Sequence, residues 1–197
     1  MPDPLYLSLW FPSFDGEDMM PRALAVLLQF PFSAQRPGIT SVALHPVSWN
    51  EATVLERRFN PGIPPAEAVD IAADILHDDY AYVFEVYWDL WILSPTTKEW
   101  TLQPSLVEII VRGPDFDEAA YEQEGQIEMD FGLDAPFLQE DVEFTSAAEA
   151  KIRANVQKLV ELNSRLEKSA GASARLLWSE SDESLAQKLV ARLQKMQ

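Results

Sequence analysis

The feature that most constrains the fold is the segment Ala81–Leu93, in which apolar and mixed positions alternate. Successive side chains of a β-strand point to opposite faces of a sheet, so a period of two predicts one long strand. One face of this strand is apolar throughout, and another layer of the structure must therefore cover it. The apolar set is Tyr82, Phe84, Val86, Trp88, Leu90 and Ile92, and it alternates with Val83, Glu85, Tyr87, Asp89 and Trp91.

Two further segments extend this strand into a predicted antiparallel meander. Pro95–Lys98 is a turn that leads into Glu99–Arg112, where Pro104 indicates an edge position or a bulge. Gln126–Leu133 repeats the alternation, with four apolar residues on one side. Short alternating runs joined by turns predict three neighbouring antiparallel strands.

Shorter runs elsewhere bring the expected number of strands to about seven. Leu5–Phe11 alternates with both faces largely covered, and Ile39–Val47 is followed by Thr53–Phe59 at hairpin spacing. We expect Asn60-Pro61-Gly62 to end that hairpin. Arg175–Ser179 is predicted to be a short strand near the C-terminus.

Apolar residues at helical spacing predict four helices between these strands. Their expected positions are after Asp15 or Asp18, over about residues 65–78, from a capping box at Ser146 to Gly171, and after a cap at Asp182.

These elements predict an α+β fold in which an antiparallel sheet is packed against helices on one face. Residues 1–197 are expected to form a single domain. The order of strands and helices also suggests two pseudo-repeated halves, 1–80 and 81–197, that share one core.

The net charge limits the classes of partner. The chain has 32 acidic and 15 basic residues, a formal charge of −17, and no cysteine. Such a surface repels phosphate, so we expect neither nucleic acid nor an anionic membrane as a partner. No disulfide, thiolate nucleophile or cysteine-ligated metal is possible. The sequence shows neither a secretory signal nor a run long enough for a membrane span, and a cytoplasmic protein is expected.

The charge is unevenly distributed along the chain. Residues 1–150 carry 27 acidic and 6 basic side chains, which gives −21, whereas residues 151–197 carry 5 and 9, which gives +4. A basic segment of this kind can mark an interaction site. The favoured interpretation is that the last helices dock on the acidic body of their own chain.

One candidate metal site lies on the polar face of the predicted helix 65–78. Asp70, Asp74 and His77 follow Glu67 at helical spacing, and Asp78 comes next. An acid three residues before a histidine is the spacing by which helical bundles present two metal ligands. Those sites need a matching second helix, which the sequence does not offer, so a solvated face is the favoured interpretation and no cofactor is predicted.

The second candidate site is the outer face of the predicted meander. If this face is open, its carboxylates and aromatic rings suit a basic peptide, a cationic ligand stacked on Trp or Tyr, or a sugar ring. The candidate residues for binding a partner are Glu85, Tyr87, Asp89 and Trp91 on the long strand, with Glu108, Glu128 and Asp130 on its neighbours, beside Arg112.

The acidic segment 113–143 holds eleven acids and no base, but its spacing fails the pattern of a calcium-binding EF-hand. No nucleophile elbow, glycine-rich phosphate loop or zinc-protease motif occurs in the chain. We therefore expect a non-catalytic binding protein that acts on a protein partner or as a homodimer. The alternatives are a metal-dependent enzyme that uses Asp70, Asp74 and His77, and a small-molecule carrier with an aromatic pocket near Trp88, Phe84 or Phe131.

Overall fold

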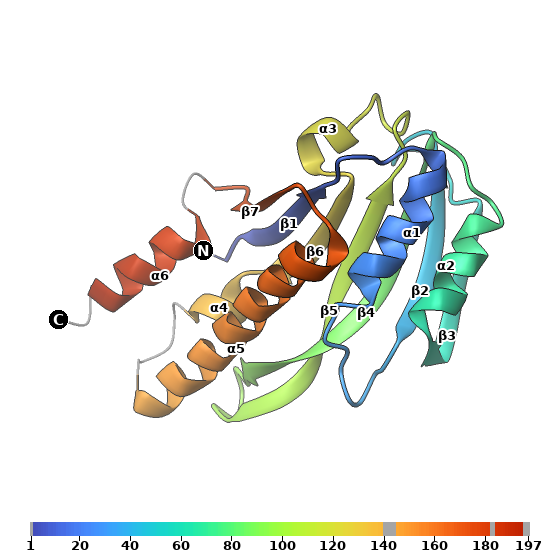
Figure 1. Cartoon of the computed structure of the whole chain (residues 1–197). Coiled ribbons are helices and arrows are strands. Elements are labelled where there is room, and N and C mark those ends of the chain that lie inside the picture. Colours follow the sequence, from blue (N-terminus) through green and yellow to red (C-terminus); the bar gives the residue numbers. More distant parts are fainter. Residues whose placement is uncertain (1, 140–144, 182–183, 195–197) are drawn as a thin grey trace.

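Seven strands form one antiparallel sheet in the order β3-β2-β4-β5-β6-β1-β7. The computed structural model describes residues 2–139, 145–181 and 184–194 (Figure 1). The α+β fold is thus confirmed. The strands are β1 (Pro4–Trp10), β2 (Ile39–Pro46), β3 (Leu55–Ile63), β4 (Tyr80–Leu93), β5 (Trp100–Arg112), β6 (Ile127–Leu133) and β7 (Ala174–Ser179). The helices are α1 (Gly16–Leu27), α2 (Pro65–Ala73), α3 (Tyr121–Glu124), α4 (Ala135–Leu138), α5 (Ser146–Arg165), which continues into a π-helical turn (Leu166–Ala170), and α6 (Leu185–Gln194).

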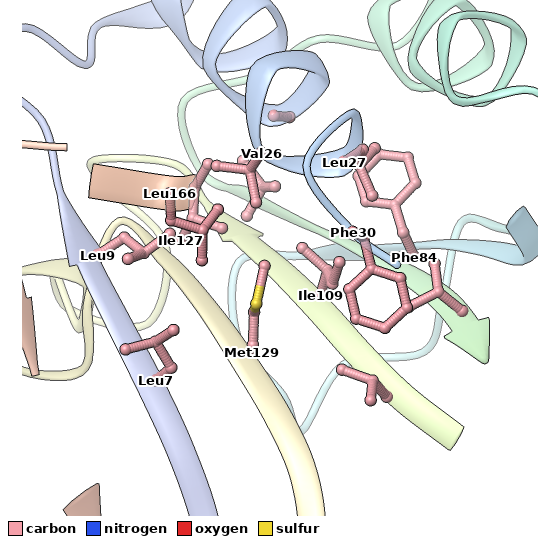
Figure 2. Close-up of a cluster of buried hydrophobic side chains, with 14 of the residues drawn as sticks. Leu7, Leu9, Val26, Leu27, Phe30, Phe84, Ile109, Ile127, Met129 and Leu166 are labelled. Atoms are coloured by element: carbon pink, nitrogen blue, oxygen red, sulfur yellow. The ribbon is translucent and has the colours of Figure 1, made fainter. Parts of the chain in front are cut away.

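Helices α1, α2 and α5 lie side by side over one face of the sheet (Figure 1). The apolar face that the long alternating segment predicts is the face they cover, and Trp88 and Phe84 on β4 are fully buried there. Figure 2 shows how Leu7, Ile109 and Met129 from three strands meet Val26, Leu27 and Phe30 from α1 and the turn that follows it. Burial of apolar surface at roughly 25 cal/mol per Å² makes this layer the main stabilising contact of the fold.

The core is continuous from Leu5 to Leu185. Strand β1 lies between β6 and β7, which belong to the second half of the chain. Strand β1 of the proposed half 1–80 therefore lies among the strands of the half 81–197, whereas β2 and β3 lie together at the other edge of the sheet. The pseudo-repeat of these two halves stays a prediction.

Helix α2 is shorter than the sequence predicts, because the chain turns back toward the sheet after Ala73. The hydroxyl of Tyr82, buried on β4, accepts a hydrogen bond from the backbone N–H of His77 at 2.8 Å and donates to the carbonyl of Ile75 at 2.9 Å. These bonds satisfy backbone groups that would otherwise extend the helix. The expected helix end at residue 78 is wrong.

Strand β3 is longer than predicted. The tripeptide that was expected to end the hairpin lies inside the strand, which continues to Ile63. Ile39 pairs with Ile63 and Ser41 pairs with Arg58, so residues 59–62 of β3 lie opposite the single residue Thr40. This large bulge keeps a proline and a glycine within an edge strand, where both are tolerated.

The end of β4 extends beyond β2 and would leave an open edge. Asn155 of α5 closes it, because its side-chain amide accepts from the Trp91 N–H and donates to the Trp91 carbonyl, both at 2.8 Å. Lys158 donates to the backbone carbonyl of Asp89 on the same edge. Covering an edge in this way prevents pairing with another chain.

The basic C-terminal segment contacts the acidic body of its own chain. Lys188 of α6 is paired with Asp3 and, at 2.8 Å, with Asp134. These contacts fit the favoured interpretation of the charge asymmetry. The expected helix cap at Asp182 lies outside the described residues. In the described part of the chain, no helix combines the length and apolar character that a membrane crossing needs.

Candidate functional site

The outer face of the sheet is the face opposite α1, α2 and α5. Its centre carries three acidic residues on neighbouring strands, Glu85 of β4, Glu108 of β5 and Asp130 of β6. Glu85 lies directly opposite Glu108, and Glu108 lies directly opposite Asp130. We call these three residues the carboxylate row. Each is only partly buried, so the row faces solvent.

The same line of cross-strand neighbours continues beyond the row on both sides. Asp130 lies opposite Tyr6 of β1, and Tyr6 opposite Trp178 of β7. On the other side Glu85 lies opposite Ser41 of β2, and Ser41 opposite Arg58 of β3. One line of neighbouring residues therefore crosses all seven strands. It runs from Arg58 through Ser41 to the three acids, and it ends at the rings of Tyr6 and Trp178.

The backbone geometry brings the first two carboxylates close together. Asn155 binds both backbone groups of Trp91, so the odd-numbered residues at this end of β4 direct their N–H and C=O groups away from β5. Glu85 and Glu108 thus form a pair without mutual backbone hydrogen bonds, whose Cα atoms lie about 4.5 Å apart in antiparallel sheets. Strands are about 4.8 Å apart, so the row is about 10 Å long.

The central carboxylate, Glu108, lies between two like charges. Burial raises the pKa of Glu108, and the charges of Asp130 and Glu85 raise it further. None of the basic side chains in the described residues is ion-paired with the row: Arg58 pairs with Glu56, and Arg112 with Glu128 and Glu124. Like charges directly opposite each other destabilise a sheet.

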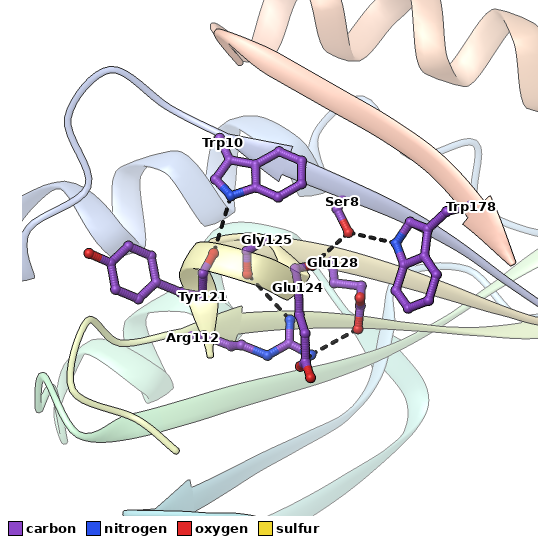
Figure 3. A network of polar contacts seen from close by, with 8 residues as sticks. All are labelled: Ser8, Trp10, Arg112, Tyr121, Glu124, Gly125, Glu128 and Trp178. Atoms are coloured by element: carbon purple, nitrogen blue, oxygen red, sulfur yellow. Dashed lines mark hydrogen bonds and ion pairs between the residues drawn. The ribbon is translucent and has the colours of Figure 1, made fainter. Parts of the chain in front are cut away.

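Glu128 lies on the outer face but is not available to a partner. It is 4% exposed, and its carboxylate accepts a hydrogen bond from Arg112 Nη2 at 2.8 Å (Figure 3). Arg112 is 3% exposed and also pairs with Glu124 at 2.9 Å. Burial raises the pKa of Glu128, and the Arg112 charge opposes that shift. This buried pair joins α3 to the sheet beside the row.

The aromatic end of the line is held by the same network (Figure 3). The indole N–H of Trp178 donates to Ser8 Oγ at 2.9 Å, and the Ser8 hydroxyl donates to the carbonyl of Glu124 at 2.6 Å. The Trp178 ring stacks on Tyr6 with 4.6 Å between ring centroids. Burial, with the charge of Asp130, raises the pKa of Tyr6 to about 12, so its hydroxyl stays protonated at neutral pH.

The other residues predicted for this face have mixed roles. Tyr87 carries the guanidinium of Arg36 over its ring, 3.8 Å from the centroid. Asp89 accepts a hydrogen bond from the backbone N–H of Ala34, and Lys151 covers the ring of Trp91 at 3.2 Å. The structure therefore brings together Glu85, Glu108 and Asp130, and Asp130 Oδ1 also accepts a hydrogen bond from the Gly132 N–H at 2.7 Å. Contacts with the protein itself occupy Tyr87, Asp89, Trp91 and Glu128.

Sequence reasoning missed four residues of this line and its surroundings: Tyr6, Trp178, Arg36 and Arg58. Tyr6 alternates with the buried leucines of its strand, and this signal indicates an outer-face position. No pattern in a single sequence shows that β1 lies beside β6, and only that pairing places Tyr6 next to Asp130.

The metal candidates do not gather into a site. Because α2 ends at Ala73, His77 lies beyond the helix, where its ring packs on Tyr80 at 4.5 Å between centroids. Asp70 and Asp74 are exposed. In residues 2–139, 145–181 and 184–194, no three histidine, aspartate or glutamate side chains are placed to hold a metal ion.

The rings proposed to line a carrier pocket are packed against other rings in the core. Trp88 stacks on Phe131 with 5.1 Å between centroids and lies 5.9 Å from Phe30 and 6.1 Å from Phe137. Phe84 is fully buried beside them. These contacts fill the space between sheet and helices at this point.

No model of a known protein family matches the chain, and no curated protein or solved structure shows significant similarity to it. The geometry of the outer face is therefore the basis for any functional argument.

Proposed function

We propose that the chain is a non-catalytic binding protein whose carboxylate row binds a basic segment of a partner protein. The observation that carries the proposal is the direct cross-strand register of Glu85, Glu108 and Asp130. Three acids in this arrangement repel one another, and lysine or arginine side chains placed over them remove that repulsion.

The rings beside the row suit the same kind of ligand. The Tyr87 ring carries the guanidinium of Arg36, so a cation of the chain's own already lies at this end of the row. The stacked pair Tyr6 and Trp178 offers a second aromatic surface at the opposite end. Cations over aromatic rings gain about 0.5–1 kcal/mol at exposed sites.

The charge of the row argues against a second copy of the chain as its ligand. A twofold dimer places the same patch of both subunits face to face. Two carboxylate rows would then oppose each other, and such like-charge contacts cost several kcal/mol. A homodimer through another surface remains a separate prediction, which sedimentation equilibrium tests directly.

The test uses a fluorescent hexapeptide of alternating serine and arginine, acetylated and amidated, titrated with the protein at low salt. Three surface ion pairs at roughly 0.5–1 kcal/mol each predict that the variant E85Q/E108Q/D130N binds about ten- to hundredfold more weakly. The control variant E67Q/D70N/D74N removes three exposed acids of α2 and its C-terminal cap, with the same change in net charge.

We expect the affinity for the peptide to fall strongly in the row variant and by less than about twofold in the α2 variant. Equal losses would show that only the net charge attracts the peptide, and the proposal would be wrong. Absence of binding by the unaltered protein would also overturn it.

A further inference from the structure

A pocket opens at the basic end of the line that contains the carboxylate row. It lies where β2 and β3 lose regular pairing, because residues 59–62 of β3 oppose only Thr40. Its volume is about 530 Å³, within the range of small-ligand sites. Bulges of this kind often redirect side chains beside functional sites. The lining includes Gln35, Arg36, Arg58, Asn60, Glu85 and Tyr87.

The pocket differs from the rest of the acidic body in its charge. Its lining carries two guanidinium groups against one carboxylate. Side-chain amides of Gln35 and Asn60 add neutral hydrogen-bond donors. These groups suit a ligand that carries an anionic group for the two arginines and a cationic group for Glu85.

Arg36 is held in place although it is exposed. Its guanidinium lies over the Tyr87 ring, and none of the described residues forms an ion pair with it. The turn that carries it is fixed, since Ser33 Oγ accepts from the backbone N–H groups of Gln35 and Arg36, and the Ser33 N–H donates to the Tyr87 carbonyl. A preorganised cation loses little freedom when it binds an anion.

Arg58 reaches the pocket from β3. Its Nε and Nη2 atoms donate to Glu56 Oε1 at 3.1 and 2.9 Å. A guanidinium has five N–H donors, so this contact leaves most of them for another acceptor. The contact also sets the orientation of the planar group, which favours recognition of a carboxylate.

We infer that this pocket binds the terminal carboxylate of the partner segment, so that the segment ends in a basic residue with a free C-terminus. The inference rests on the proposed function. Arg58 and Glu85 lie on strands two positions apart, about 10 Å across the sheet. That distance corresponds to about three residues of extended chain, so the carboxylate reaches Arg36 and Arg58 while basic side chains reach Glu85 and Glu108.

The test compares two acetylated hexapeptides of alternating serine and arginine that end in arginine, one with a free carboxylate and one amidated. A protein of net charge −17 repels an added carboxylate, so without the pocket the amidated peptide binds more tightly. With the pocket, the free-carboxylate peptide binds about fivefold more tightly.

Arginine variants test whether the preference for the free carboxylate arises in the pocket. Arg36→Gln and Arg58→Gln should each abolish the preference for the free carboxylate. Arg57→Gln is the matched control, because Arg57 pairs with Val42, a buried residue of the helix-covered face, and so lies on the opposite side of the same strand. It should keep the preference.

Equal or tighter binding of the amidated peptide overturns the inference and leaves the proposed function standing. Absence of binding by both peptides overturns both. A preference that survives Arg36→Gln and Arg58→Gln places the carboxylate elsewhere, and free L-arginine that binds as tightly as the peptide rules out a peptide terminus as the ligand. Both of these results contradict the inference.

Discussion

Replacing Glu108 by glutamine should stabilise the folded protein. Glu108 is the middle member of the carboxylate row and has an acid directly opposite it on each side. Two unit charges about 5 Å apart repel each other by about 0.8 kcal/mol in water. Two such neighbours, reduced for side-chain freedom and screening, predict a gain of about 1 kcal/mol in the free energy of unfolding at pH 7 and low salt.

The gain should depend on pH in a defined direction. The folded-state pKa of Glu108 is raised, so its contribution to stability is fully present below the unfolded pKa of about 4.3 and is lost as the pH rises through the folded value. Glutamine does not ionise, so the variant does not lose this stability as the pH rises. The difference between Glu108→Gln and the unaltered protein should therefore shrink toward zero below about pH 4.

Urea unfolding measures this difference. With a slope of about 2 kcal/mol per molar urea, the midpoint at pH 7 should rise by about 0.5 M. The difference should also shrink in 1 M NaCl, where the Debye length is about 3 Å. Glu99→Gln is the control, because Glu99 is exposed in the β4–β5 turn and its carboxylate makes no ion pair with another described residue. A lower midpoint for Glu108→Gln, or an equal rise for both variants, would show that repulsion within the carboxylate row does not lower stability.

Three further predictions concern contacts that support the outer face and the sheet edges. Lys188→Met should lower the free energy of unfolding by about 3 kcal/mol, since Asp134 is fully buried and would lose its cation; a loss below 1 kcal/mol in urea unfolding would contradict this. Asn155→Ala should cost about 2 kcal/mol, because Trp91 on the edge of β4 loses both of its hydrogen bonds with the Asn155 side chain, and faster hydrogen exchange should appear at the Trp91 amide; unchanged exchange would show that the edge does not depend on Asn155. Burial raises the pKa of Tyr6 and of Tyr82 to about 12, so ultraviolet titration should show tyrosine ionisation near pH 12, and stability should fall between pH 10 and 12; a titration with no step near pH 12 would contradict this.

The sequence predicted those parts of the fold that depend on local periodicity. The alternation in Ala81–Leu93 identified β4 and its buried face, and helical spacing identified α1 and α5. The end of α2 was predicted wrongly because the hydroxyl of Tyr82 captures the backbone of the turn, a contact from another element. Tertiary contacts of this kind override local propensity.

The candidate site was predictable only in part, for a related reason. The outer-face position of Glu85, Glu108 and Asp130 follows from a period of two within each strand. Their alignment depends on register, and the addition of Tyr6 and Trp178 depends on β1 and β7 joining the end of the sheet. The pocket depends on the β3 bulge, whose proline and glycine indicated a turn.

The most direct test of the central claim is a map of amide chemical shifts in ¹⁵N-labelled protein titrated with the amidated serine–arginine peptide at low salt. We expect the largest changes on β4, β5 and β6 around Glu85, Glu108 and Asp130, and we expect them to disappear in E85Q/E108Q/D130N. Changes concentrated on the acidic segment 115–124 or on α2, with the carboxylate row undisturbed, would contradict it.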